Sequence, residues 1–229
     1  MDASLVKDAD SVVAWSRLVL RGPDAVSFLD GQWSQVVPNE GGAPVDGALL
    51  HPDGTVVSAP RAERLAGDAV ALDVPSESAE ATESRLRRFR LRVAVEFAWA
   101  QCPSPPYATR GAQVDLGAPE ASEFAVGAVP QAFGEQFVST RVSFTKGCFT
   151  GQELVGRLDA RGGSAPFRLV RLRVPTLEAL AAWEESWQTE AQRRSQITTV
   201  VRSDTGVSAL ALAHRTVSLE VVGGTGEWL

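Results

Sequence analysis

The segment 146–153 reads KGCFTGQE and contains one of only two cysteines in the 229-residue chain. In an extended backbone, side chains two residues apart point the same way, so Lys146 and Cys148 are expected to share a face. A nearby ammonium group favours the thiolate form of cysteine, which is both a nucleophile and a metal ligand. The segment therefore predicts a reactive or ligand-holding cysteine loop.

The neighbours of Cys148 add to this prediction. Gly147 and Gly151 permit backbone angles that other residues avoid, or allow a ligand to approach the main chain. Gln152 and Glu153 supply an amide and a carboxylate, which can recognise a heterocycle with mixed donors and acceptors. The alternative is packing, because a lone free cysteine often serves as a small buried residue.

The chain before this loop alternates between strand and helix patterns, with turn residues at the junctions. Strands are predicted over 12–21, 69–74 and 93–100, helices over 23–35 and 76–91, and a hairpin over 48–58 with Pro52-Asp53-Gly54 at its tip. This order predicts an α+β fold of the split βαβ (ferredoxin-like) type. Its sheet is expected to be rich in antiparallel pairs, with both helices on one face.

The rest of the chain is patterned less regularly. Residues 101–122 are rich in proline and glycine and predict a linker or a reduced insert. A strand-like segment, Val138–Thr145, comes directly before the cysteine loop. A strand over 167–174, a helical stripe over 177–194 and strands over 196–202, 208–213 and 216–222 are expected to follow.

The composition of the chain limits the kinds of partner that the protein is expected to bind. A net charge of −6 does not favour nucleic acid or anionic membranes, so direct nucleic-acid binding is not expected. The arginines between 85 and 92 are interpreted as a solvated helix face, with a folate tail or RNA phosphates as the alternative partners. Two cysteines and two histidines leave little for a metal site, and none is predicted. Without a long apolar run or a signal-like N-terminus, no membrane partner is expected and a cytoplasmic location is predicted.

The string KGCFTGQE closely resembles the K-G-C-Y-x-G-Q-E signature of the YgfZ family, a branch of the glycine-cleavage T-protein (aminomethyltransferase) superfamily. Phe149 stands where the signature has tyrosine. Residues 15–32, WSRLVLRGPDAVSFLDGQ, resemble the family's opening strand and helix, and residues 47–100 resemble its hairpin and its Leu/Arg-rich helix. Gly127–Pro130 resembles its G-x-P stretch, and Leu154–Arg157 its x-V-A-R stretch.

This resemblance implies a T-protein-like fold that binds tetrahydrofolate in a central cavity. It also implies a role in assembling or repairing iron–sulfur clusters of client enzymes, including some that modify tRNA. Cys148 would be the functional thiol and Lys146 its activator. The residues expected to bind the folate are Trp15, Gln32, Gln152, Glu153 and Arg157.

Four regions follow from the patterns and the resemblance together. They are an N-terminal folate-binding α+β region over 1–100, a shortened linker or insert over 101–126, a signature segment over 127–170, and a reduced C-terminal β-rich domain over 171–229. Two other functions remain open at this point. One is a folate-dependent aminomethyl transferase, which needs a carboxylate to activate its substrate. The other is a non-catalytic scaffold that has lost folate binding.

Overall fold

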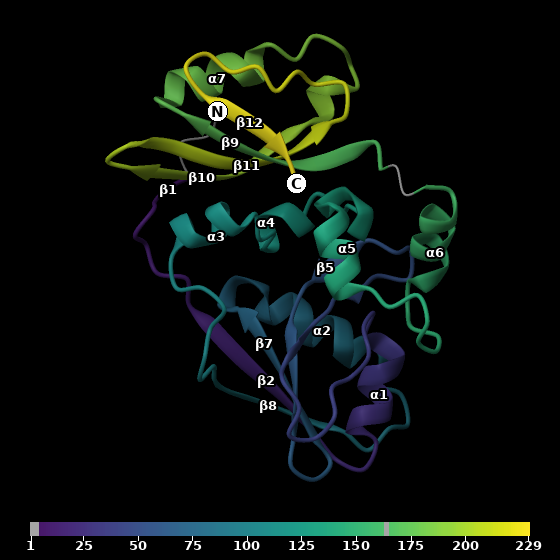
Figure 1. The fold of residues 1–229 in the computed structure, drawn as a ribbon. Coiled ribbons are helices and arrows are strands. Elements are labelled where there is room, and N and C mark those ends of the chain that lie inside the picture. Colours follow the sequence, from purple (N-terminus) through teal and green to yellow (C-terminus); the bar gives the residue numbers. More distant parts are fainter. Residues whose placement is uncertain (1–4, 163–164) are drawn as a thin grey trace.

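The computed structural model of the chain describes residues 5–162 and 165–229, and it contains two five-stranded sheets with a layer of short helices between them (Figure 1). Residues of the first hundred form most of one sheet, and the end of the chain forms most of the other. Helices from the middle of the chain lie between the two sheets (Figure 1). Within the described residues, no helix is long and apolar enough to cross a bilayer.

The N-terminal sheet has the strand order β3-β6-β7-β2-β8, and every neighbouring pair in it is antiparallel. Its strands are β2 (Trp15–Arg21), β3 (Val45–Asp46), β6 (Arg61–Leu65), β7 (Ala69–Pro75) and β8 (Glu96–Gln101). A separate short hairpin pairs β4 (Leu49–Leu50) with β5 (Val56–Ser58), as the Pro-Asp-Gly turn predicts.

Two helices cover one face of this sheet. They are α1 (Ala25–Gln32) and α2 (Ala79–Phe89), the second preceded by the 3-10 turn η2 (Ser76–Ser78). Leu18 and Leu20 of β2 belong to the same buried cluster as Leu29 of α1 and Leu86 of α2. Since both helices share that cluster, the predicted split βαβ arrangement is confirmed.

The C-terminal sheet has the order β1-β10-β11-β9-β12. Its strands are β1 (Val6–Asp8), β9 (Phe167–Val174), β10 (Gln196–Ser203), β11 (Gly206–His214) and β12 (Thr225–Trp228). Strand β1 pairs with β10 in parallel, so the beginning of the described chain joins the sheet built by its end. The helix α7 (Leu177–Glu185) packs Leu180 and Trp183 against this sheet, and the 3-10 turn η4 (Gln192–Arg194) precedes β10.

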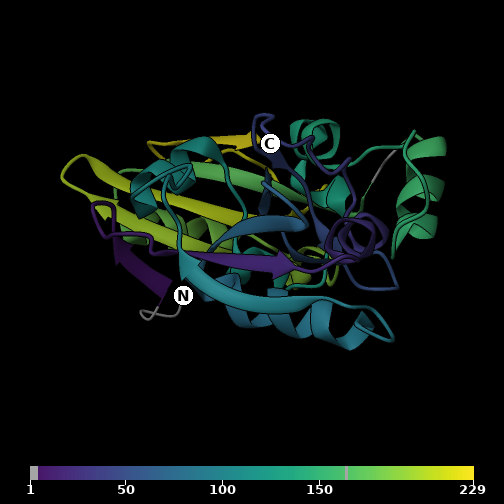
Figure 2. The same cartoon turned by 90° about the horizontal axis from the view of Figure 1, so that it is seen from below.

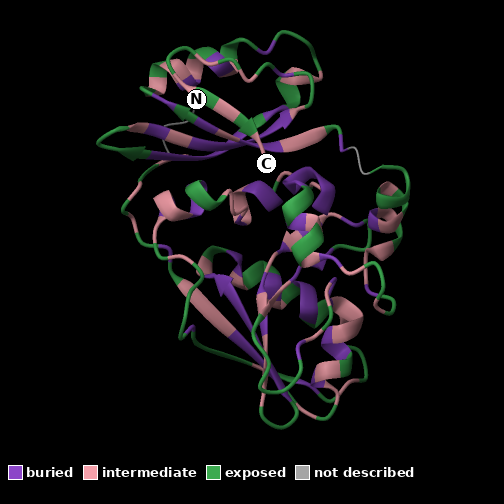
Figure 3. Ribbon diagram, viewed as in Figure 1, coloured by how far each residue is buried: buried purple, intermediate pink, exposed green. Residues whose placement is uncertain are grey.

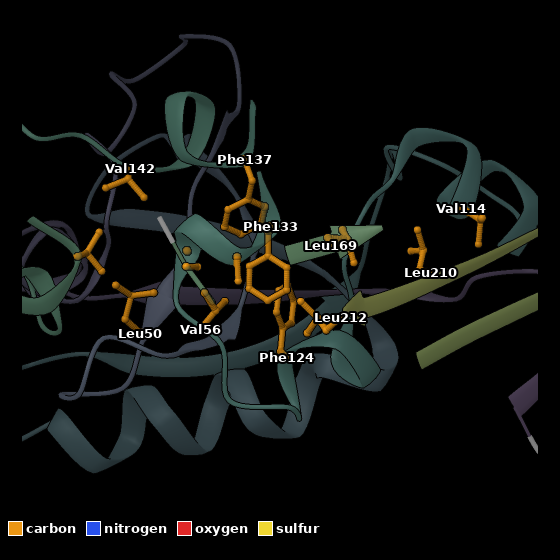
Figure 4. Close-up of a cluster of buried hydrophobic side chains, with 14 of the residues drawn as sticks. Leu50, Val56, Val114, Phe124, Phe133, Phe137, Val142, Leu169, Leu210 and Leu212 are labelled. Carbon is orange, nitrogen blue, oxygen red and sulfur yellow. The ribbon is translucent and has the colours of Figure 1, made fainter. Parts of the chain in front are cut away.

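Five short helical segments form the middle layer. They are α3 (Arg110–Leu116), α4 (Ala121–Phe124), η3 (Pro130–Phe133), α5 (Glu135–Arg141) and α6 (Gln152–Ala160). Phe124, Phe133 and Phe137 contact one another in the cluster that also includes Leu50 of the hairpin and Leu212 of β11 (Figure 4). Buried residues therefore run from the β4–β5 hairpin through the helices to the C-terminal sheet (Figure 3). Helix α6 lies at the rim of the molecule (Figure 2).

Two predicted strands are wrong. Residues 138–141 of the expected strand 138–145 belong to α5, because Phe137 packs into the aromatic cluster from that helix. The segment predicted as a strand over 216–222 is not one, and β12 pairs with β9 in its place. Leu219 and Val221 still pack against the α7 cluster, and the Trp183 indole donates a hydrogen bond to the Ser218 carbonyl at 2.7 Å.

Candidate functional site

The signature lysine is anchored at the end of α1. The Lys146 side chain is only 4% exposed, and its Nζ donates hydrogen bonds to the carbonyls of Asp30 and Trp33 at 2.8 Å and of Gln35 at 3.0 Å. It also lies 2.9 Å from Asp30 Oδ1. The last carbonyls of a helix lack partners within the helix and carry partial negative charge, which a cation stabilises. Lys146 therefore fixes the cysteine loop to the C-terminal end of α1.

A second contact between the loop and α1 passes through Gln32. Thr150 donates its backbone N–H to the Gly31 carbonyl and its hydroxyl to Gln32 Oε1, both at 3.1 Å. The same amide oxygen accepts from Arg85 Nη1 at 2.9 Å, and Arg85 Nε donates to the Leu50 carbonyl at 2.6 Å. Gln32, predicted to bind the ligand, thus links α1, α2 and the cysteine loop. Burial lowers the pKa of Arg85 to about 10, with the charge of Arg88 acting in the same direction.

Cys148 is exposed on this anchored loop. Residues 142–149 form bends and irregular backbone, so the extended geometry assumed for Lys146 and Cys148 is wrong. The lysine side chain turns inward to α1, whereas the thiol faces solvent. Lys146 is therefore buried against α1, whereas the Cys148 thiol lies on the surface.

The remaining signature residues lie along α6. Glu153 is 87% exposed and forms an ion pair with Arg157 one turn later, at 2.7 Å. Gln152 begins the helix and is half-buried. None of these three residues lines the cavity described next, and neither does Cys148.

The cavity lies among the N-terminal sheet, the middle helices and the end of the chain, and has a volume of about 310 Å³. Trp15 is the one predicted ligand-binding residue in its wall. The polar and charged side chains of the wall include Asp46, Arg61, Tyr107, Glu120, Gln136, Thr140 and Arg141. Phe124, Phe133 and Phe137 form an apolar part of the wall and also belong to the core (Figure 4).

One side of the cavity combines aromatic rings with a buried acid. The Trp15 and Tyr107 rings meet edge to face with centroids 5.0 Å apart, and the Trp15 indole donates to the Tyr107 carbonyl at 3.0 Å. The Tyr107 hydroxyl donates to Glu120 Oε1 at 2.5 Å, and Arg110 pairs with Glu120 Oε2. Glu120 is 1% exposed, and burial raises its pKa. Burial and the Glu120 charge also raise the pKa of Tyr107.

Sequence reasoning missed Tyr107 and Glu120 because both lie in the segment 101–126, interpreted as a linker or insert. The segment contains α3 and α4. Two local signals could have revealed these helices. Thr109 accepts from the Ala112 N–H as the N-cap of α3, and Glu120 and Glu123 form a capping box at the start of α4.

Comparisons with known proteins identify the fold. No family model matches the sequence, and no curated protein matches it. Among solved structures, glycine cleavage system aminomethyltransferase T from Bartonella henselae is similar with a TM-score of 0.55 and 12% identity, over 89% of this chain and 77% of that one. The fold is that of the glycine-cleavage T-protein.

At this identity the likeness concerns the fold alone. It agrees with the predicted T-protein-like fold, whereas the resemblance to the YgfZ family rests on the signature residues alone. Among residues 5–162 and 165–229, no group of three or more histidine, cysteine, aspartate or glutamate side chains could hold a metal ion. The T-protein fold here presents two separate features, a partly open cavity at Trp15 and an exposed thiol on an anchored loop.

Proposed function

We propose that the cavity at Trp15 binds tetrahydrofolate. The observation that carries the proposal is a cavity of about 310 Å³, partly open to solvent, inside a T-protein fold, with aromatic rings and a buried carboxylate in its wall. Ligand sites commonly combine a mostly apolar pocket of about 300–1,000 Å³ with a few polar groups. This volume is at the low end of that range, so the cavity suits the bicyclic ring of a folate with the rest of the molecule reaching outward.

The wall offers suitable chemistry for such a ring. Trp15 and Tyr107 provide aromatic surface for contact with a flat heterocycle. Glu120 offers carboxylate oxygens, which accept hydrogen bonds from ring or amino N–H groups. Its existing bonds to Tyr107 and Arg110 fix its orientation before any ligand arrives.

We further propose that the protein is an accessory factor that supports assembly or repair of iron–sulfur clusters in client enzymes through Cys148. The cluster would be the cargo of this reaction. An exposed thiol outside the cavity suits contact with a partner protein better than reaction with a cavity-bound ligand. The anchoring of the loop at Lys146 and Thr150 holds that thiol at a fixed place on the surface.

An aminomethyl transferase is the second candidate, favoured by the carboxylates in the cavity wall. Asp24 accepts a hydrogen bond from the Ala94 N–H, Asp30 pairs with Lys146, and neither lines the cavity. The acids that do line it are Asp46 and Glu120. Glu120, whose pKa burial raises, is the group that could accept a proton from a substrate amine.

A titration with tetrahydrofolate under anaerobic conditions tests the binding proposal. Wild type should bind, Trp15→Leu should bind at least tenfold more weakly, and Trp99→Leu should bind normally because Trp99 lies on β8 outside the cavity wall. Absence of binding by the folded wild type contradicts the proposal and favours the scaffold alternative.

The role of the thiol needs a cellular measurement. Cys148→Ala should retain folate binding yet fail to support iron–sulfur enzyme activity in cells that depend on this protein. Cys102→Ala is the matched control. Release of a one-carbon unit from an aminomethylated donor, dependent on folate and lost in Glu120→Gln, would instead establish the transferase.

A further inference from the structure

Two arginines from distant segments meet in the cavity wall. Arg61 begins β6, and Arg141 ends α5. Arg61 Nε and Arg141 Nη1 each lie 3.6 Å from the same atom, Asp46 Oδ1. A hydrogen bond from nitrogen to oxygen normally measures about 2.7–3.2 Å, so this carboxylate attracts both guanidinium groups without accepting a hydrogen bond from either.

These two nitrogens are buried donors with no partner. Among the described residues, neither Arg61 Nε nor Arg141 Nη1 has a hydrogen-bond acceptor, although both are shielded from solvent. Buried polar groups in proteins are nearly always hydrogen-bonded, and each exception calls for a physical explanation. Both arginine side chains line the same cavity, so an acceptor that arrives with a ligand would meet these donors after a small shift of the side chains.

The charges around the cavity also favour an anion. The guanidinium groups of Arg61 and Arg141 share one carboxylate, that of Asp46. The Asp46 side chain is 36% exposed, so water screens part of its negative charge. The other cavity acid, Glu120, is already bonded to Arg110 and Tyr107. Burial lowers the pKa of Arg141, Asp46 opposes that shift, and the charge of Arg61 adds to it. An additional negative charge would therefore stabilise both cations.

We infer that Arg61 and Arg141 bind a carboxylate of the ligand that occupies this cavity. The identity of that ligand rests on the folate-binding proposal above, which supplies a molecule with an aromatic ring and an acidic tail. A planar guanidinium matches a carboxylate through paired N–H···O bonds, and these charged bonds are about twice as strong as neutral ones. The cavity thus selects ligands that combine a flat ring with an oxyanion.

The test compares two reduced ligands with the same ring, tetrahydrofolate and a tetrahydropterin that lacks the acidic tail. Arg61→Gln and Arg141→Gln should each weaken tetrahydrofolate binding about tenfold or more and leave tetrahydropterin binding unchanged. Arg88→Gln, which removes an exposed positive charge outside the cavity wall, is the control for net charge and should change neither affinity.

Substitution of Asp46 should change the affinity for tetrahydrofolate in the opposite direction to substitution of either arginine. Asp46→Asn removes the carboxylate that competes for the two arginines, so it should tighten tetrahydrofolate binding. If the three charges were only a structural cluster, this change would weaken binding or leave it unaltered. Equal effects of the arginine variants on both ligands, or no effect on either, would overturn the inference.

The subsite can also be tested without folate, by adding glutamate or inorganic phosphate at constant ionic strength and following the melting temperature. A rise with either anion in wild type that disappears in both arginine variants supports the subsite, even if wild type binds no folate and the proposed function fails. The two anions separate a carboxylate site from a phosphate site. No rise with either anion, together with no difference between tetrahydrofolate and tetrahydropterin, overturns the inference.

Discussion

Lys146 Nζ lies 2.9 Å from Asp30 Oδ1 and 2.8 Å from the Asp30 carbonyl, across a separation of 116 residues. The lysine that comes two residues before an exposed cysteine is thereby one of the connections between the cysteine loop and the N-terminal sheet region. Lys146, which the sequence suggested as an activator of the thiol, instead caps the C-terminal end of α1. The lysine is buried at α1 while the thiol is exposed, and the backbone bends at Lys146.

Lys146→Met should destabilise the protein by about 2–4 kcal/mol, because three partly buried carbonyl oxygens lose a charged donor. Urea unfolding followed by circular dichroism measures the change. Lys7→Met is the matched control, since Lys7 forms an exposed ion pair with Glu77 of the kind that contributes about 0–1 kcal/mol. Equal stability of the two variants would contradict the structural role of Lys146.

The first hundred residues were largely predictable from sequence because their signals are local. The helices α1 and α2 follow helical spacing, and β2 and β7 are apolar runs bounded by turn residues. The hairpin likewise follows from Pro52-Asp53-Gly54. In each of these elements, the structure that the local sequence pattern favours is also the one that packs against the neighbouring elements.

The middle of the chain was not predictable in the same way. The β-branched residues near Val138 favour a strand, but burial of Phe137 against Phe133 selects a helix. Lys146 acquires its role from partners over a hundred residues away. The cavity joins Trp15 with Arg61, Tyr107 and Arg141, and no sequence spacing shows that such distant residues meet.

Two glycines of the signature should respond differently to the same substitution. Gly151 has a φ of +85°, and a Cβ there would lie 2.5 Å from the His51 carbonyl oxygen. A Cβ at Gly147 would meet no heavy atom within 4 Å, and the φ of Gly147 is not positive. Gly151→Ala should therefore cost about 1–3 kcal/mol or more, whereas Gly147→Ala should stay within about 0.5 kcal/mol.

Thermal unfolding of both variants beside wild type checks this difference. It also tests how the hairpin tip meets α6, because Gly151 packs against Leu50 and Gly54. A stable Gly151→Ala protein would mean that the hairpin and the loop are not in contact.

The two cysteines should label at very different rates. Cys148 is exposed, whereas Cys102 is buried, and burial raises the pKa of the Cys102 thiol. Since the thiolate is the species that reacts, iodoacetamide at neutral pH should modify Cys148 first and Cys102 only after unfolding. Mass spectrometry of peptides over a time course gives both rates. Faster labelling of Cys102 in the native protein would contradict the placement of both thiols.

Glu77 should make stability depend on acid pH. Partial burial alone would raise the pKa of Glu77, but the hydrogen bond from Lys7 and the charge of Arg110 outweigh it and hold that pKa below its ordinary value of 4.5. A carboxylate with a lowered pKa in the folded state stabilises the fold above its unfolded pKa, and this contribution is lost as the pH falls through the folded pKa.

The unfolding free energy of wild type should therefore decline below about pH 4.5 more steeply than that of Glu77→Gln. Urea unfolding from pH 6 to pH 3 measures the difference, with Glu80→Gln, an exposed change on the next helix, as control. If the curves of wild type and Glu77→Gln stay parallel over this range, the Lys7–Glu77–Arg110 contact does not form in solution.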